Sequence, residues 1–181
     1  MEKLNYIMLV ICSLIRKMFM GAIYGRGIHI NWFTLIHPSA TIRLFGKNSK
    51  VVIGNRVYIR NNSEIEACNG TIVFEDNVFI NKNCMIVSMK KIFIGSNTTI
   101  APGVMIYDHD HNFYNITKEK YICKAIEIGK NVWIGANCVI LKGVTIGDNA
   151  IIGAGSVVTR DVEKNCLYVG NPAIKVKTIK V

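Results

Sequence analysis

The segment formed by residues 107–127 carries side chains that could catalyse proton transfer. It contains His109 and His111, with Asp108 before the pair and Asp110 inside it. A histidine is largely neutral at pH 7, because its unperturbed pKa is about 6.5, and can then accept a proton from a reacting hydroxyl group. The two acids could orient an imidazole or bind ligand hydroxyls, but we expect them to be solvated loop side chains. This segment therefore predicts general-base chemistry.

The sequence around this segment repeats every six residues. After it, an aliphatic residue occupies every sixth position at Ile128, Ile134, Ile140, Ile146, Ile152 and Val158. Glycine follows four of them, at Gly129, Gly135, Gly147 and Gly153. A period of six fits neither a helix nor a plain strand, and a fixed short repeat is typical of a solenoid. Three hexads would make one triangular coil, with aliphatic side chains inside and Gly, Asn or Asp at the corners.

A less regular form of the repeat precedes the segment. It runs in blocks of three hexads, close to one coil per block, at Ile36 and Ile42, then Ile53, Ile59 and Ile65, then Phe74, Ile80 and Ile86, then Ile94, Ile100 and Ile106. The repeat stops over residues 107–127, and a loop of this length inside a solenoid is usually functional. The pattern predicts an all-β solenoid over residues 31–166, preceded by a helical segment (1–30) and followed by a tail (167–181).

Composition narrows the range of partners. The chain has a formal net charge of +10, which favours an acidic membrane surface or a phosphorylated cofactor. No stretch combines basic residues with stacking aromatics, so we expect no nucleic-acid partner. None of the six cysteines forms a CxxC pair, and no Cys/His cluster has metal-ligand spacing. We expect buried, reduced cysteines and no metal.

Residues 4–24 form the most apolar part of the chain. Arg16 and Lys17 interrupt this run after about twelve uncharged residues, which is short of the roughly twenty that span a bilayer. We expect a helix that either caps the first coil or lies in a membrane interface. In the second case Lys3, Arg16, Lys17 and Arg26 would add affinity for anionic lipid.

Several motifs together resemble the hexapeptide-repeat acyltransferases. They are the hexads, the loop after APGVMIYDHDHNF, the block NVWIGANCVILKGVTIG and the closing VGNPA, which together cover roughly residues 50–176. The chain is most similar to the branch with maltose/galactoside O-acetyltransferases and capsule or O-antigen O-acetyltransferases. The resemblance implies a left-handed parallel β-helix with a short N-terminal helix and an excursion loop. It also implies a homotrimer, acetyl-CoA as donor, and active sites between neighbouring subunits.

The resemblance also suggests catalytic residues. The family's base lies in a pattern similar to V-x-I-Y-x-x-x-H, which places it at His111, while His109 falls where relatives often have a non-titrating residue. Asn81 lies thirty residues earlier and resembles the asparagine that contacts the acceptor or the tetrahedral intermediate. Asn83 is the alternative in the same motif, and asparagine is also a favoured corner residue.

The donor site is predicted near the C-terminal coils. The pantetheine arm would lie along small residues, and Trp133 resembles a residue beside the same groove. The candidates for the groove are Trp133, Gly135, Ala136 and Ala154, and those for the CoA phosphates are Lys142, Arg160 and Lys175. Ile174 occupies the usual arginine position of GNPAR, and Lys175 would replace it as a point charge.

These features predict a transferase that acetylates a sugar hydroxyl of a surface polysaccharide or its lipid-linked precursor. We expect it in the cytoplasm, at the inner face of a bacterial membrane. Acetylation of a sugar amine, of serine or of an antibiotic hydroxyl remains open. A zinc lyase on the same solenoid would need three ligating histidines, and an inert scaffold would not need the loop histidines. The acceptor itself does not follow from the sequence.

Overall fold

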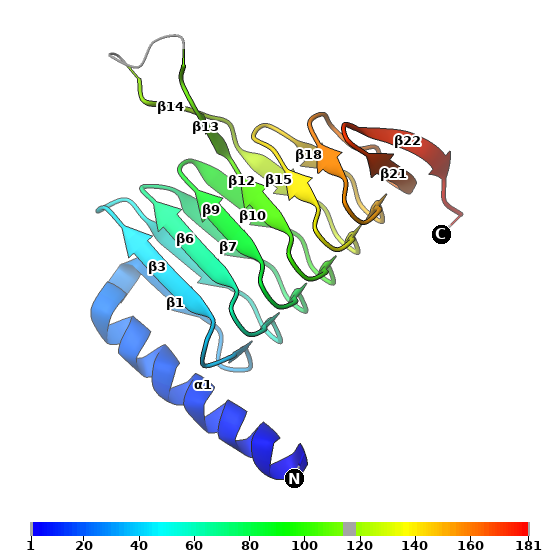
Figure 1. Cartoon of the computed structure of the whole chain (residues 1–181). Helices are drawn as coiled ribbons and strands as arrows, with labels where there is room; N and C mark the ends of the chain where they lie inside the picture. Colours follow the sequence, from blue (N-terminus) through cyan, green and yellow to red (C-terminus); the bar gives the residue numbers. More distant parts are fainter. Residues whose placement is uncertain (1, 114–118, 181) are drawn as a thin grey trace.

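The protein consists of an N-terminal helix followed by a triangular parallel β-solenoid (Figure 1). The computed structural model describes residues 2–113 and 119–180, with side chains from Ile7 onward. Helix α1 (Glu2–Tyr24) leads through the short 3-10 helix η1 (Gly25–Gly27) into the first coil.

Each coil contributes one strand to each of three flat sheets. Sheet A contains β1 (Ile28–Ile30), β4 (Lys50–Ile53), β7 (Thr71–Phe74), β10 (Lys91–Ile94), β15 (Ile126–Ile128) and β18 (Thr145–Ile146). Sheet B contains β2 (Leu35–Ile36), β5 (Tyr58–Ile59), β8 (Phe79–Ile80), β11 (Thr99–Ile100), β16 (Trp133–Ile134), β19 (Ile151–Ile152), β21 (Cys166–Gly170) and β22 (Ala173–Thr178). Sheet C contains β3 (Thr41–Phe45), β6 (Glu64–Cys68), β9 (Met85–Ser88), β12 (Met105–Tyr107), β17 (Val139–Ile140) and β20 (Val157–Val158). Neighbouring strands pair in parallel, except for the antiparallel pair β21–β22.

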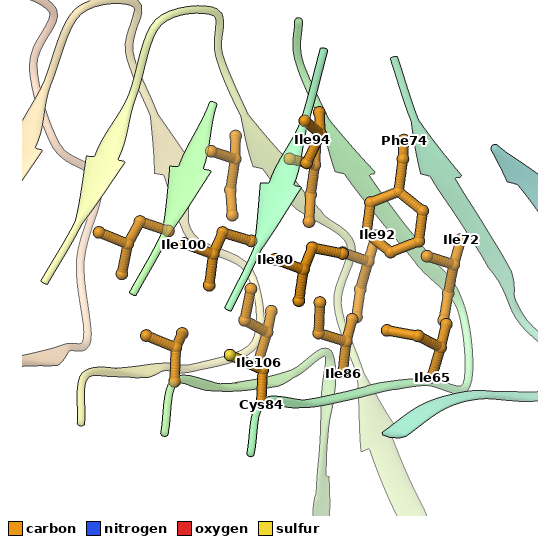
Figure 2. Packing of buried hydrophobic residues seen from close by; sticks show 14 of the residues in the cluster. Ile65, Ile72, Phe74, Ile80, Cys84, Ile86, Ile92, Ile94, Ile100 and Ile106 are labelled. Atoms are coloured by element: carbon orange, nitrogen blue, oxygen red, sulfur yellow. The ribbon is translucent and has the colours of Figure 1, made fainter. Parts of the chain in front are cut away.

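The core is built from the aliphatic residues of the hexads. Every hexad residue predicted to point inward is buried, which confirms the repeat. In sheet B, Ile80 pairs with Ile100, and Ile100 pairs with Ile134 on the next coil. Figure 2 shows such stacked isoleucines filling the inside of the prism. Because each fully buried isoleucine contributes about 1.5–3 kcal/mol, these stacks hold the coils in register.

Asparagines stack at the corner between sheets A and B. Their backbones have positive φ, between 54° and 60°, a conformation that asparagine tolerates better than most residues. Four of the five side-chain amides donate to the asparagine of the next coil over 2.8–3.1 Å. The ladder consists of Asn77, Asn97, Asn131, Asn149 and Asn165. The corners therefore use the residue type that the sequence predicted.

Helix α1 covers the open end of the first coil. This coil has no preceding coil to pair with, so part of its backbone needs other partners. Ser13 Oγ accepts a hydrogen bond from the Ile36 backbone N–H at 3.0 Å. Arg16 donates to the carbonyls of His37 and Pro38 at 2.6 Å each, as the capping interpretation requires.

Two boundaries and one interpretation of the helix differ from those predicted. The solenoid begins at Ile28 rather than at residue 31, because β1 pairs with β4. The tail does not leave the fold, because β21 joins sheet B beside β19 and β22 folds back along β21. By length and composition alone, Ile7–Gly27 is long and apolar enough to cross a membrane, so the expectation that this run is too short was wrong.

Candidate functional site

The predicted loop contains a β-hairpin that leaves the solenoid directly after β12 (Figure 1). Strand β13 (His109–His111) pairs antiparallel with β14 (Tyr121–Cys123), and His111 lies opposite Tyr121. Because side chains alternate along a strand, the two histidines share one face of the hairpin and Asp110 lies on the other. Residues 114–118 of the predicted loop lie outside the described residues.

Asp108 anchors the base of the hairpin, and the expectation of a solvated acid was wrong for it. Its side chain is fully buried. It accepts hydrogen bonds from Ser88 Oγ at 2.7 Å, from the Met89 backbone N–H at 2.7 Å and from the Lys90 backbone N–H at 2.8 Å. These donors lie on the preceding coil and compensate for the loss of water around the charge.

The Asp108 carboxylate also engages the first histidine. His109 Nδ1 lies 3.3 Å from Asp108 Oδ1, and the His109 side chain is only 16% exposed. The rings of Tyr107 and Tyr121 pack edge-on against its imidazole, with centroids 6.1 and 5.7 Å away. A carboxylate on Nδ1 fixes the orientation of an imidazole, so proton exchange with a ligand would go through Nε2.

His111 is the more accessible of the two histidines. It is exposed, and its ring lies 4.9 Å from the Tyr121 ring and 6.1 Å from the Phe113 ring. On the opposite face of β13, Asp110 forms an ion pair with Lys142, which follows β17. Asp110 is thus a paired acid, and Lys142, predicted to contact CoA phosphates, braces the hairpin against the next coil.

The other predicted site residues line the edge of the prism where sheet B turns into sheet C. Asn81, Gly135 and Ala136 each follow a strand of sheet B there, and Ala154 occupies the position equivalent to Ala136 one coil later. The Ala136 carbonyl accepts from the Gly155 backbone N–H at 2.8 Å, which aligns the two alanines along the edge. The structure therefore brings the predicted acceptor residue and the predicted CoA groove to one edge.

Individual residues on this edge have distinct local roles. Asn81 Oδ1 accepts from the Lys82 backbone N–H at 2.9 Å and from Arg60 Nη1 at 3.3 Å, so its amide is held in place. Asn83 has φ of +58°, and this corner conformation explains its presence without a catalytic role. A Cβ on Gly135 would lie 2.5 Å from the Ala154 backbone nitrogen, so only glycine fits this close approach. Trp133 faces outward from sheet B and is 53% exposed.

The remaining cation candidates lie near the C-terminal end. Arg160 is exposed after β20. Lys175 Nζ lies 2.7 Å from Glu163 Oε2, and this hydrogen bond raises the pKa of the lysine. Ile174 is exposed beside it, so no guanidinium occupies that position. A CoA phosphate at this end would compete with Glu163 for Lys175.

Within one chain, the two halves of the site lie at opposite ends of sheet C. The hairpin leaves after the last residue of β12, whereas Asn81 and Ala136 lie at the edge where the strands of sheet C begin. Sequence analysis missed Ser88 and Tyr121, which hold Asp108 and His109. The separation of Ser88 from Asp108 by twenty residues, about one coil, was the available signal.

Among the residues with described structure, no group of three or more His, Cys, Asp or Glu side chains could hold a metal ion. The six cysteines are free thiols, and Cys84, Cys138 and Cys166 are buried. Burial raises the pKa of the Cys84 and Cys138 thiols, which therefore act as small apolar residues in the corners.

Residues 125–160 match the family described as bacterial transferase hexapeptide (six repeats). A putative acetyltransferase of Dictyostelium discoideum is 36% identical over 143 residues, which span 78% of this chain and 72% of that protein. The chain belongs to the hexapeptide-repeat transferases. Its solenoid is the left-handed parallel β-helix of this family, as expected.

Two further relatives carry more specific names. Nodulation protein L of Rhizobium meliloti (strain 1021) is 44% identical over 97 residues, or 52% of this chain and 53% of that protein. A putative lipopolysaccharide biosynthesis O-acetyl transferase of Escherichia coli (strain K12) is 31% identical over 119 residues, or 60% and 61%. The matches therefore span little more than half of the length of these two proteins.

Solved structures agree with the fold. A galactoside acetyltransferase in complex with coenzyme A is 29% identical, with a TM-score of 0.60 over 91% of this chain and 70% of that one. AntD, an N-acyltransferase from Bacillus cereus crystallised with coenzyme A, has a TM-score of 0.77 over 92% of this chain and 90% of its own. AntD is only 21% identical, so this likeness concerns the fold alone.

Proposed function

We propose that this hexapeptide-repeat protein is an acetyl-CoA-dependent O-acetyltransferase that acts on a sugar hydroxyl of a surface polysaccharide or its lipid-linked precursor. The histidine pair on the β13–β14 hairpin, held at its base by buried Asp108, supports this assignment most directly. The name of the Escherichia coli relative supports transfer to oxygen, and the coenzyme A bound to the galactoside acetyltransferase supports the donor.

The reaction needs one proton acceptor, one surface that binds acetyl-CoA and one that binds the sugar acceptor. His111 takes the proton of the acceptor hydroxyl while the oxygen attacks the thioester carbonyl of acetyl-CoA. The tetrahedral intermediate carries a negative oxygen, which the Asn81 amide N–H can stabilise. Collapse of the intermediate breaks the C–S bond, and the imidazolium returns its proton to the CoA thiolate. The products are an acetyl ester and free CoA.

The division of roles between the histidines follows from their surroundings. His111 is exposed and can approach a ligand, whereas His109 is mostly buried between Asp108 and the tyrosine rings. We assign His111 as the general base, and His109 as a positioning residue that stiffens the strand carrying it.

A homotrimer would complete the site. One chain keeps its hairpin and its Asn81–Ala154 edge at opposite ends of sheet C, so the histidines of one copy would meet the groove of the next. Light scattering at micromolar concentration should give three times the mass of the chain, 20.2 kDa. A monomer that retains full activity would contradict this arrangement.

A thiol-release assay tests the function. Purified protein with acetyl-CoA should release CoA thiol when given nucleotide-sugars, lipid-linked oligosaccharides or free sugars, and mass spectrometry should find an alkali-labile acetyl ester on the acceptor. An alkali-stable amide on an amino sugar would instead mark an N-acetyltransferase. No thiol release above buffer with any acceptor would contradict the assignment.

A further inference from the structure

Helix α1 contacts the solenoid through both polar and apolar side chains and leaves a broad apolar side exposed. Ser13, Arg16 and Lys17 form hydrogen bonds with the first coil, while Met20 and Tyr24 pack against the hydrophobic core. A surface helix of a globular protein normally turns its large apolar residues toward the core. The exposed apolar side of α1 is therefore available to a partner other than this solenoid.

The exposed side of the helix is one continuous apolar surface, which we call the α1 face. Its members recur at the spacing of a single helix face, and each of them is at least 47% exposed. They are Ile7, Met8, Ile11, Ile15, Met18, Phe19 and Ile23. A shallow apolar hollow lined by Ile15, Met18, Phe19 and Ala22 lies on this face.

Aromatic side chains lie beside the helix on the same coil. Trp32 is 62% exposed and Phe33 is 71% exposed. Lys17 links the helix to this corner, because its Nζ donates to the Trp32 carbonyl at 2.6 Å and lies 5.5 Å from the centre of the Trp32 ring. Tryptophan beside basic residues is typical of surfaces that meet a lipid headgroup region.

The charge of this end of the molecule favours an anionic partner. Between Lys3 and Ser63 the sequence contains nine Lys or Arg and no Asp or Glu, whereas residues 64–181 contain thirteen cations and eleven acids. Arg26 in η1 is exposed, and so is Lys50 at the start of β4, a strand that contacts η1. The side chain of Lys3 lies outside those described. With Glu2 counted, residues 1–63 carry +8 of the formal net charge of +10, so most of the net positive charge belongs to the helix and the first coils.

We propose that the α1 face docks this protein onto an anionic lipid bilayer as a peripheral anchor that lies in the interface without crossing it. Apolar side chains enter the acyl boundary while the basic residues of the first coils stay at the headgroups. Arg16 and Lys17 prevent crossing, because both are hydrogen-bonded to carbonyls of the first coil. Docking is independent of the acetyl-transfer chemistry and would bring the site close to a lipid-linked acceptor.

Co-sedimentation of the full chain with vesicles tests this docking. We expect binding to vesicles of phosphatidylglycerol and phosphatidylcholine, at least tenfold weaker binding to phosphatidylcholine alone, and weakening with salt. Phe19→Ser/Ile23→Ser should reduce binding to anionic vesicles at least tenfold, because both side chains are exposed and their loss spares the core. Ile174→Ser/Val176→Ser, on the exposed β22 strand, is the matched control and should bind like the wild type.

Three results would overturn docking of this kind. The first is equal binding of wild type and Phe19→Ser/Ile23→Ser to anionic vesicles. The second is a smaller oligomer for that variant in light scattering without vesicles, which would make the α1 face a contact between copies. The third is resistance of the membrane-bound chain to alkaline carbonate extraction, which would mean that α1 spans the bilayer. Circular dichroism and elution volume verify that each variant is folded.

Discussion

Replacing Asp108 with asparagine should loosen the hairpin that carries both histidines. The carboxylate accepts from three donors on the preceding coil, the hydroxyl of Ser88 and the backbone N–H groups of Met89 and Lys90. In Asp108→Asn, an NH₂ group replaces one of the two oxygens. An NH₂ group at the position of Oδ1 would face the Met89 N–H, and an NH₂ group at the position of Oδ2 would face the Lys90 N–H. Either way, at least one buried donor loses its acceptor.

The expected destabilisation follows from that count. Leaving one buried N–H without a partner costs about 1–3 kcal/mol. The Ser88 hydroxyl can rotate to accept from the new NH₂ group, so it adds little. For a chain of this length, each kcal/mol lowers the melting temperature by about 2–4 °C. We therefore expect Asp108→Asn to melt roughly 2–12 °C below wild type.

Asp110→Asn is the matched control. It removes a carboxylate two residues away whose side chain is 45% exposed and whose partner, Lys142, reaches it from the next coil. A partly exposed ion pair of this kind contributes about 0–1 kcal/mol. Melting of both variants is measured at one protomer concentration, since stability of an oligomer depends on concentration. Equal melting temperatures for Asp108→Asn and wild type would refute the anchoring role of Asp108.

Further substitutions test the core and the donor groove. Ile100→Ala removes a fully buried side chain that lies between Ile80 and Ile134. It should lower the free energy of unfolding, measured with denaturant, by about 2–5 kcal/mol. The control Thr99→Ala replaces an exposed residue of the same strand and should change this free energy by less than about 0.5 kcal/mol. Similar costs for both would contradict the stacked core. Ala136→Trp or Ala154→Trp should raise the KM for acetyl-CoA strongly with oligomeric mass unchanged, and unchanged donor kinetics in both would place the groove elsewhere.

The coils could be predicted from sequence because a six-residue period has one structural consequence at each position. An aliphatic residue at Ile100 or Ile134 must point inward, and glycine at Gly135 marks a close approach of two backbones. The same period ends before residue 166, so it gave no sign of β21 and β22. Of the residues in those two strands only Cys166 is buried, so no spacing of buried aliphatic residues marks them.

The acids and the helix could not be predicted in the same way. Asp108 lies in a polar segment that indicates exposure, and its burial depends on donors that come from another coil. The apolar run in α1 indicates a helix but not which side meets the solenoid. Arg16 and Lys17 decide this, because the unpaired backbone of the first coil gives them carbonyl partners.

A comparison of kcat between His111→Ala and His109→Ala tests the proposed chemistry most directly. Loss of a general base typically costs about 10²–10⁴ in rate, so His111→Ala should lose that much in both kcat and kcat/KM while its fold and acetyl-CoA binding persist. His109→Ala should lose much less, since its side chain positions the strand. If His111→Ala keeps more than about a tenth of the wild-type kcat while His109→Ala is inactive, the base is His109 and the assignment of roles is reversed. If both variants stay active, the histidine mechanism is contradicted.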